Sequence, residues 1–175
     1  AISRELFESE LFGHRRGAYT GALSERRGAF REAHEGTLFL DEIAALPLDQ
    51  QAKLLRAVEE GLIRPLGAES PQRINTRLIA ATCEPLEQMV MDQRFRADLF
   101  ERLAVCVIRI PPLRERSEDI PALSRHLLDT AGFPDKEIVV DALGALKAQR
   151  WPGNVRELRN VLVQAALRSD ERIGL

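Results

Sequence analysis

The sequence predicts an α/β domain built on a parallel sheet, followed by a smaller all-helical domain. Two apolar runs without alternation, residues 36–42 and 77–82, are typical of strands buried on both faces of a parallel sheet. Pro111 and Pro112 then interrupt regular structure, and the sequence after them carries only helical signals. We therefore expect one domain over residues 1–112 and a second over residues 113–175.

Helices and one further strand are predicted around the two runs. Residues 5–13 predict a short helix that ends at a glycine. Two short helices are expected over residues 85–93 and 96–103, and residues 104–110, rich in Val and Ile, predict a third strand. Between the first two strands, residues 48–60 predict a longer helix stopped by a glycine, with four positions at helical spacing: Leu48, Ala52, Leu55 and Glu59.

The C-terminal domain is predicted to contain three helices. The first begins near Ser117 and ends near Gly132, and the second begins at Asp141. Asn154 is expected to cap the third helix, with Glu157 as its partner in a capping box.

The composition excludes several classes of protein. The chain has 175 residues, of which 45% are hydrophobic and 30% charged, with a net charge of −2. The slight acidity argues against DNA binding as the main role of these residues, and no apolar run approaches the ~18 residues of a membrane span. Cys83 and Cys106 are too few for a disulfide scaffold and indicate reduced thiols in a cytoplasmic protein. The first residue, Ala1, indicates a piece of a longer or processed chain.

Asp41 and Glu42 are the clearest candidates for chemistry, because they directly follow the first apolar run. Ligands of open α/β sheets bind at the carboxyl ends of the strands. Asp41 could hold the Mg²⁺ of a nucleotide, and Glu42 could polarise an attacking water. The alternative is that two acids simply end a strand and begin a turn.

Three arginines are candidates for phosphate contacts. Arg96 and Arg102 flank a predicted short helix, and guanidinium groups stabilise the charge on a phosphoryl group in transfer. Arg156 lies in the first turn of the last helix, where anions are favoured. The alternative is that each arginine pairs with a nearby acid on a solvated surface.

A glycine-bounded loop is a candidate contact for a partner. Residues 17–22 place Tyr19 and Thr20 between two glycines, and a mobile loop with an aromatic tip suits a protein contact. An ordinary surface turn is the alternative. The three histidines, His14, His34 and His126, lack the spacing of metal ligands.

Taken in order, these motifs resemble the AAA+ ATPase domain of bacterial enhancer-binding proteins, which activate sigma-54 RNA polymerase. Residues 17–22 resemble the GAFTGA loop, with Tyr in place of Phe, and residues 36–43 resemble a Walker B strand. Residues 95–103 resemble the arginine-finger segment, and residues 151–158 resemble the sensor II motif of the helical lid. The resemblance covers nearly the whole chain.

The resemblance implies a role for each candidate. Asp41 would bind Mg²⁺ on ATP, and Glu42 would orient the hydrolytic water. Arg96 and Arg102 would reach the nucleotide of a neighbouring subunit in a homo-oligomeric ring, with Arg102 as the finger proper. Arg156 would touch the γ-phosphate from the lid.

The resemblance also implies a polymerase contact and a second part of the nucleotide site. The loop would press on sigma-54 through Gly17, Ala18, Tyr19, Thr20, Gly21 and Ala22. Thr82 and Cys83 would lie against the nucleotide at the sensor I position. DNA would be bound only through a separate domain outside this chain.

Two departures from the family pattern matter. The 175 residues contain no Walker A loop, which family members carry upstream, so we expect the chain alone to be inactive as an ATPase. Cys83 stands where the family usually has Asn, and a thiol lacks the amide donor. A docking module whose catalysis has decayed is therefore an alternative. The loop sequence argues against a third class, a different AAA+ machine such as a helicase loader.

Overall fold

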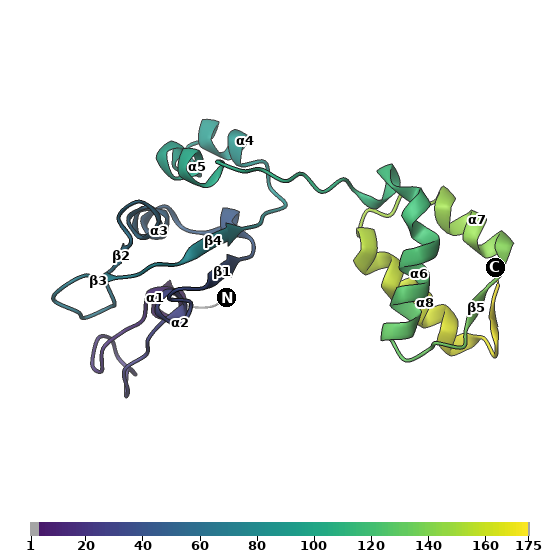
Figure 1. Ribbon diagram of the computed structural model, residues 1–175, viewed down its shortest axis with the longest axis horizontal. Helices are drawn as coiled ribbons and strands as arrows, with labels where there is room; N and C mark the ends of the chain where they lie inside the picture. Colours follow the sequence, from purple (N-terminus) through teal and green to yellow (C-terminus); the bar gives the residue numbers. More distant parts are fainter. Residues whose placement is uncertain (1–3, 175) are drawn as a thin grey trace. The chain divides into compact units, whose positions relative to one another are not determined.

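The computed structural model describes residues 4–174 as two compact units, with the boundary between Val107 and Ile108. The first unit contains, in chain order, α1 (Arg4–Phe12), α2 (Ala29–Glu32), β1 (Thr37–Leu40), a 3₁₀ turn (Ile43–Ala45), α3 (Leu48–Glu60), β2 (Leu62–Ile63), β3 (Gln72–Arg73), β4 (Arg77–Ala80), α4 (Leu86–Met91) and α5 (Ala97–Leu103) (Figure 1).

The sheet of the first unit is formed by the two expected strands. β1 and β4 pair in parallel, with Leu38 opposite Leu78 and Leu40 opposite Ala80. The side chains of these four residues pack against a core that α1, α3, α4 and α5 supply with buried residues such as Leu54. A small antiparallel pair, β2 with β3, was not expected from the sequence.

Only one face of the β1–β4 sheet is buried. Successive side chains of a strand point to opposite faces, and Phe39 and Ile79, on the other face, are 58% and 43% exposed. The prediction of strands buried on both faces is therefore wrong for the described residues. The lack of alternation in the sequence indicates that both faces are apolar, but residues 4–174 cover only one of them.

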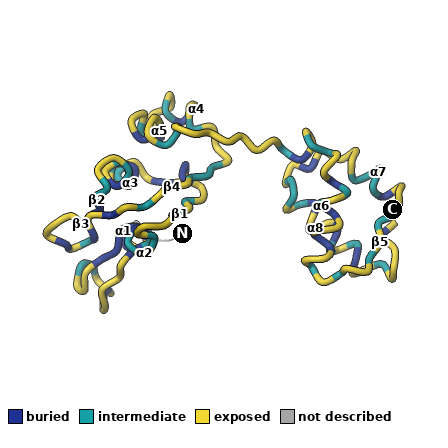
Figure 2. Tube along the Cα trace, viewed as in Figure 1, coloured by how far each residue is buried: buried dark blue, intermediate teal, exposed yellow. Residues whose placement is uncertain are grey.

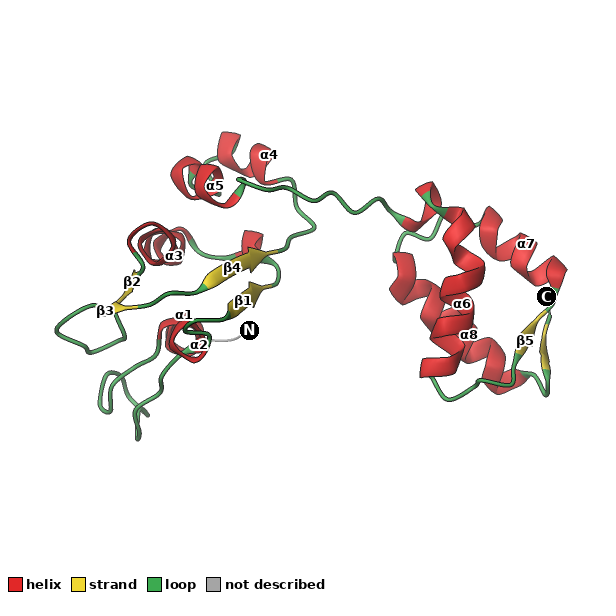
Figure 3. Cartoon of the chain, in the orientation of Figure 1, coloured by secondary structure: helices red, strands yellow, loops and turns green. Residues whose placement is uncertain are grey.

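Residues 104–110 do not form the predicted third strand. The segment is irregular, and Val105, Val107, Ile108 and Ile110 are exposed (Figures 2 and 3). A strand exists only where a neighbour pairs with its backbone N–H and C=O groups. No strand among residues 4–174 pairs with this segment, so it does not form a strand despite its high strand propensity.

Helix α3 has the predicted bounds but buries a different face. Gly61 ends the helix with a φ of 63°, as a glycine stop should. The buried residues are Gln50, Gln51, Leu54 and Ala57, whereas Leu48 is exposed. The predicted stripe is therefore wrong, because two glutamines whose amides find hydrogen-bond partners occupy the inner side of the first turn.

The second unit is a helical bundle with one short strand pair. After 3₁₀ turns at Leu113–Glu115 and Ser117–Asp119 it contains α6 (Ile120–Thr130), β5 (Glu137–Ile138), α7 (Val140–Ala148), α8 (Asn154–Arg168) and β6 (Arg172–Ile173). Its core brings Leu128 of α6 against Leu158 and Leu162 of α8. Among residues 4–174 no helix is long and apolar enough to cross a membrane.

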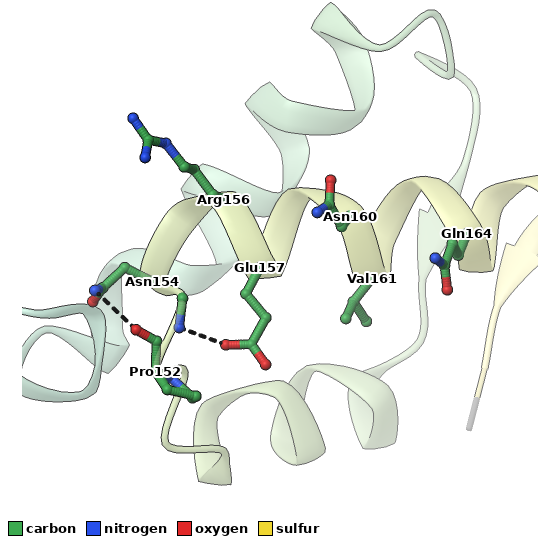
Figure 4. Close-up of a pocket in the computed structure, with 8 residues that line it drawn as sticks. Pro152, Asn154, Arg156, Glu157, Asn160, Val161 and Gln164 are labelled. Carbon is green, nitrogen blue, oxygen red and sulfur yellow. Dashed lines mark hydrogen bonds between the residues drawn. The ribbon is translucent and has the colours of Figure 1, made fainter. Parts of the chain in front are cut away.

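The start of α8 differs from the predicted capping box. Gly153 is the N-cap residue, and the Asn154 side chain caps nothing in α8. Instead, Asn154, at a φ of 52°, accepts a hydrogen bond from the backbone N–H of Leu113 through Oδ1 at 2.8 Å. Glu157 still reaches back, accepting the Gly153 N–H at 2.8 Å (Figure 4). The prediction that Asn154 caps α8 is wrong, because its side chain accepts the N–H of Leu113, in another segment, instead of an N–H of α8.

The open face of the β1–β4 sheet leads us to expect self-association of the 175-residue chain. Sedimentation velocity should show an average mass that rises with concentration, because exposed contiguous apolar surface associates in water. The double substitution Phe39→Thr with Ile79→Thr should lower that rise. Val140→Thr, at an apolar residue of the helical unit that is 82% exposed, is the matched control and should have no effect. A chain that stays monomeric at every concentration would contradict this expectation.

Candidate functional site

The carboxyl end of the β1–β4 sheet carries Asp41 and Glu42. Two backbone bonds join the chains just past the strand ends: Ala81 N donates to Leu40 O at 2.9 Å, and Ile43 N donates to Ala81 O at 3.0 Å. Between these bonds the chain turns through Glu42, whose φ of 52° is in the left-handed region. The Glu42 N–H donates to Asp41 Oδ1 at 3.1 Å. Both carboxylates directly follow the strand end, and both are exposed.

The same pairing brings the end of β4 to these carboxylates. The Cys83 thiol donates a hydrogen bond to Glu42 Oε2, with Sγ and Oε2 3.6 Å apart. This bond and the negative charge of Glu42 raise the pKa of the Cys83 thiol. Thr82 forms a local turn by accepting the Glu84 N–H at 3.0 Å. Four predicted site residues therefore meet at one edge: Asp41, Glu42, Thr82 and Cys83.

Arg96 begins α5 and already has an acidic partner. Its guanidinium donates two hydrogen bonds to Asp98, at 3.0 Å to Oδ1 and 2.7 Å to Oδ2. The pair raises the pKa of Arg96 and lowers that of Asp98. Arg96 therefore forms an ion pair with a nearby acid, the alternative to a phosphate contact, and Asp98 of α5 orients its guanidinium.

Arg102 lies at the opposite end of the sheet from the carboxylates. It lines a hollow of about 320 Å³ together with Thr76, Arg77 and Leu78, where β4 begins. Asp41 and Glu42 follow the carboxyl end of β1, the strand that pairs with β4 in parallel. The first unit therefore does not bring its own Arg102 to Glu42.

Arg156 belongs to the second unit, in the first turn of α8. It lines an open hollow of about 560 Å³ with Asn160, Val161 and Gln164, and its exposed side chain points away from Glu157 (Figure 4). Within residues 4–174 the structure gives Arg156 no ion-pair partner.

The loop of residues 17–22 is closed by its own backbone. Gly17 N donates to Ala22 O at 2.9 Å, and the flanking chain pairs through His14 and Arg26. The Tyr19 ring is half-buried and packs edge to face against His14, with ring centroids 5.1 Å apart. Tyr19 is therefore not the free tip that the sequence suggested.

The sequence did not predict the contacts beneath Tyr19. His14 is buried, and its Nδ1 forms a 2.6 Å hydrogen bond with Ser9 Oγ from α1. His14 lacks metal-ligand spacing in the sequence, and in the structure its ring packs against Tyr19 of the loop. Gln51 was also missed, although a polar residue among the inward-facing positions of an amphipathic helix is a usable signal.

The donor set at the sheet edge fits a nucleotide-bound cation. Within residues 4–174 no group of three or more His, Cys, Asp or Glu side chains could hold a metal by itself. Mg²⁺ is commonly held by one or two carboxylates together with phosphate oxygens and water. Exposed Asp41 and Glu42 match that arrangement, because they leave room for such oxygens.

An α/β unit with carboxylates at parallel strand ends, followed by a helical unit, has the architecture of an AAA+ ATPase domain. A family model described as the sigma-54 interaction domain matches residues 1–109, and the AAA+ ATPase lid domain matches residues 114–173. The chain belongs to the sigma-54 interaction domain family. The family resemblance and the α/β fold class with a helical lid are thereby confirmed.

Similar proteins are transcriptional regulators. The DNA-binding transcriptional regulator NtrC of Azospirillum brasilense is 51% identical over all of this chain, and the nitric oxide reductase transcription regulator NorR1 of Cupriavidus necator is 51% identical over 98% of it. The chain spans 37% and 34% of those two proteins. The structure of NtrX from Brucella abortus in complex with ADP matches with a TM-score of 0.86 and 34% identity, over 99% of this chain and 40% of NtrX.

The bond between Cys83 and Glu42 predicts slow alkylation of Cys83. With Cys106→Ser to isolate one thiol, iodoacetamide should react more slowly with the folded chain than with the urea-unfolded chain. The reason is that a raised pKa lowers the thiolate fraction at any pH below the ordinary thiol pKa of about 8.5. Adding Glu42→Gln should speed the folded-state reaction, since it removes the charge. Equal folded-state rates with and without the Glu42→Gln substitution would contradict the contact.

Proposed function

We propose that this chain is the ATPase domain of a sigma-54-dependent transcriptional activator, which couples ATP hydrolysis to remodelling of the closed complex of sigma-54 RNA polymerase. Members of the family are ATPases. The observation that supports the proposal most is the parallel register of β1 and β4. It gathers Asp41, Glu42, Thr82 and Cys83 at the edge where ligands of α/β sheets bind.

The carboxylates have separate proposed roles. Asp41 holds Mg²⁺ on ATP, and the cation neutralises charge on the phosphates. Glu42 orients the hydrolytic water and accepts its proton. The Cys83 thiol, which donates to Glu42, holds that carboxylate beside the end of β4.

The arginines are proposed to act between subunits of a homo-oligomeric ring. Arg102 lies at the end of the sheet opposite Asp41 and Glu42, so it serves a neighbouring subunit's ATP rather than its own. Arg96 contributes from the start of the same helix, and exchanges Asp98 for a phosphate oxygen when a neighbour docks. Arg156 contacts the γ-phosphate from the lid, and its guanidinium has no ion-pair partner among residues 4–174.

The loop of residues 17–22 is proposed to contact sigma-54. The contact between Tyr19 and His14 holds the loop against its own subunit. A change of the bound nucleotide breaks this contact and frees the loop to reach sigma-54. DNA binding is left to other parts of such a protein, because the net charge of this chain is −2.

A chimera provides the test for Glu42. These 175 residues replace the matching segment of Azospirillum brasilense NtrC, so that a full regulator is assayed. Glu42→Gln should retain nucleotide binding and lower ATP turnover by about 10²-fold or more, the scale of a general base. Glu84→Gln, at an exposed acid just after Cys83, is the matched control and should turn over normally.

The same experiment separates the proposal from the docking alternative. If the unsubstituted chimera hydrolyses no ATP yet still activates transcription, the chain is a docking module. Cys83, in place of the usual Asn, is the residue that favours this alternative. Turnover of Glu42→Gln within a factor of two of the unsubstituted chimera would exclude Glu42 from the mechanism.

The loop proposal predicts separate effects on transcription and hydrolysis. In the chimera, Tyr19→Ala should abolish transcription from a sigma-54 promoter while ATP turnover stays within about twofold, because the ring supplies a large contact area away from the carboxylates. Tyr19→Phe keeps the ring and should be tolerated. Normal transcription with Tyr19→Ala would show that the loop is not the contact.

A further inference from the structure

Gln51, in the first turn of α3, joins three segments of the first unit through its side-chain amide. It is completely buried. Its Nε2 donates to Leu46 O at 2.8 Å and to Arg94 O at 3.1 Å, and its Oε1 accepts the backbone N–H of Arg96 at 2.9 Å. All three partners are backbone groups, so the bonds fix chain positions rather than side-chain conformations.

The segments that Gln51 joins lead to the two groups of proposed catalytic residues, the carboxylates and the arginines. Leu46 ends the short turn that begins directly after Glu42. Arg94 and Arg96 lead into α5, whose N-cap residue is Arg96. The glutamine therefore ties the chain after the carboxylates to the start of the helix that carries both arginines.

Few side chains could replace this amide. An amide supplies two N–H donors and a carbonyl acceptor, whereas a carboxylate lacks the donors and an ammonium lacks the acceptor. The neighbouring Gln50 differs, although it is also buried. Its Nε2 donates to the side chains of Glu8 and Asp49, and its Oε1 has no hydrogen-bond partner among the described residues. Of these two glutamines, Gln51 is the one whose side chain has hydrogen bonds to residues 94–96 in the described part of the chain.

We propose that Gln51 is a positioning residue for the two arginines. Its bond to the Arg96 N–H sets the residue from which α5 begins, since the Arg96 carbonyl then accepts the first bond of the helix, from Phe100 N at 3.0 Å. Arg102 lies on the same rigid helix, so its direction follows from that start. This inference rests on the proposed role of Arg96 and Arg102 in hydrolysis.

The first test measures the contact in the 175-residue chain itself. Hydrogen exchange should be faster at the backbone amide of Arg96 in Gln51→Met, which keeps the length of the side chain but has no donor or amide acceptor. Gln50→Met, in the same turn and equally buried, is the matched control and should leave exchange at Arg96 unchanged. Unchanged exchange in Gln51→Met would overturn the contact.

The second test measures turnover in the chimera. Gln51→Met should lower kcat by about tenfold while KM stays within about twofold, because misplacing a group by about 1 Å can cost up to 10²-fold in rate. A general loss of folding would instead lower the active fraction in proportion to the unfolded protein, which circular dichroism measures. If Gln51→Met fails to fold, Gln51→Leu, which also lacks the acceptor for the Arg96 N–H, takes its place, with the same loss of kcat expected.

Arg96→Ala and Arg102→Ala distinguish the two ways in which the inference can fail. If they lose turnover and Gln51→Met does not, the inference is wrong and the proposed arginine role stands. If neither arginine variant loses turnover, the proposed role is wrong and the inference falls with it. Loss of kcat in Gln51→Met and in the arginine variants, with Gln50→Met unchanged, supports the inference.

Discussion

The parallel pairing of β1 with β4 is the constraint on which the first unit depends. It fixes which residues follow the two strands side by side, and so brings Cys83 to Glu42 across 41 positions of sequence. A slip of one residue would move every side chain of the strand to the other face. The buried face, with Leu38 and Leu78 opposite each other, holds the register and thus the proposed site.

The placement of Arg102 explains why one copy does not complete the proposed site. The carboxylates follow the end of the sheet, whereas Arg102 lines a hollow at the start of β4. If Arg102 serves a neighbouring subunit, as proposed, its own subunit must hold it in place, and Gln51 is the buried side chain proposed to do so. The loop carrying Tyr19 is likewise held by its own subunit, through His14. The two groups proposed to face partners are thus both held by buried polar residues, Gln51 and His14.

The accuracy of the sequence-based predictions varied with the range of the interactions involved. Gly61 ends α3 as expected, because the left-handed conformation at a helix end is a local property of glycine. The Asn154 cap failed because a more distant donor, the N–H of Leu113, took its side chain. Residues 104–110 do not form the predicted strand, because a strand needs a second segment to pair with. Strand propensity describes one segment alone and does not say whether such a partner is present.

The sequence by itself determined the fold class, the family and the identity of the candidate carboxylates and arginines, because these follow from periodicity and from motifs in order. Tertiary structure alone decided which of them meet. It brought Cys83 to Glu42, packed Tyr19 against His14 and buried two glutamines in the first turn of α3. The physical reason is that a polar side chain bonds to whichever partner the folded chain brings within reach, and for Cys83 and Gln51 such partners lie more than 40 positions away in the sequence.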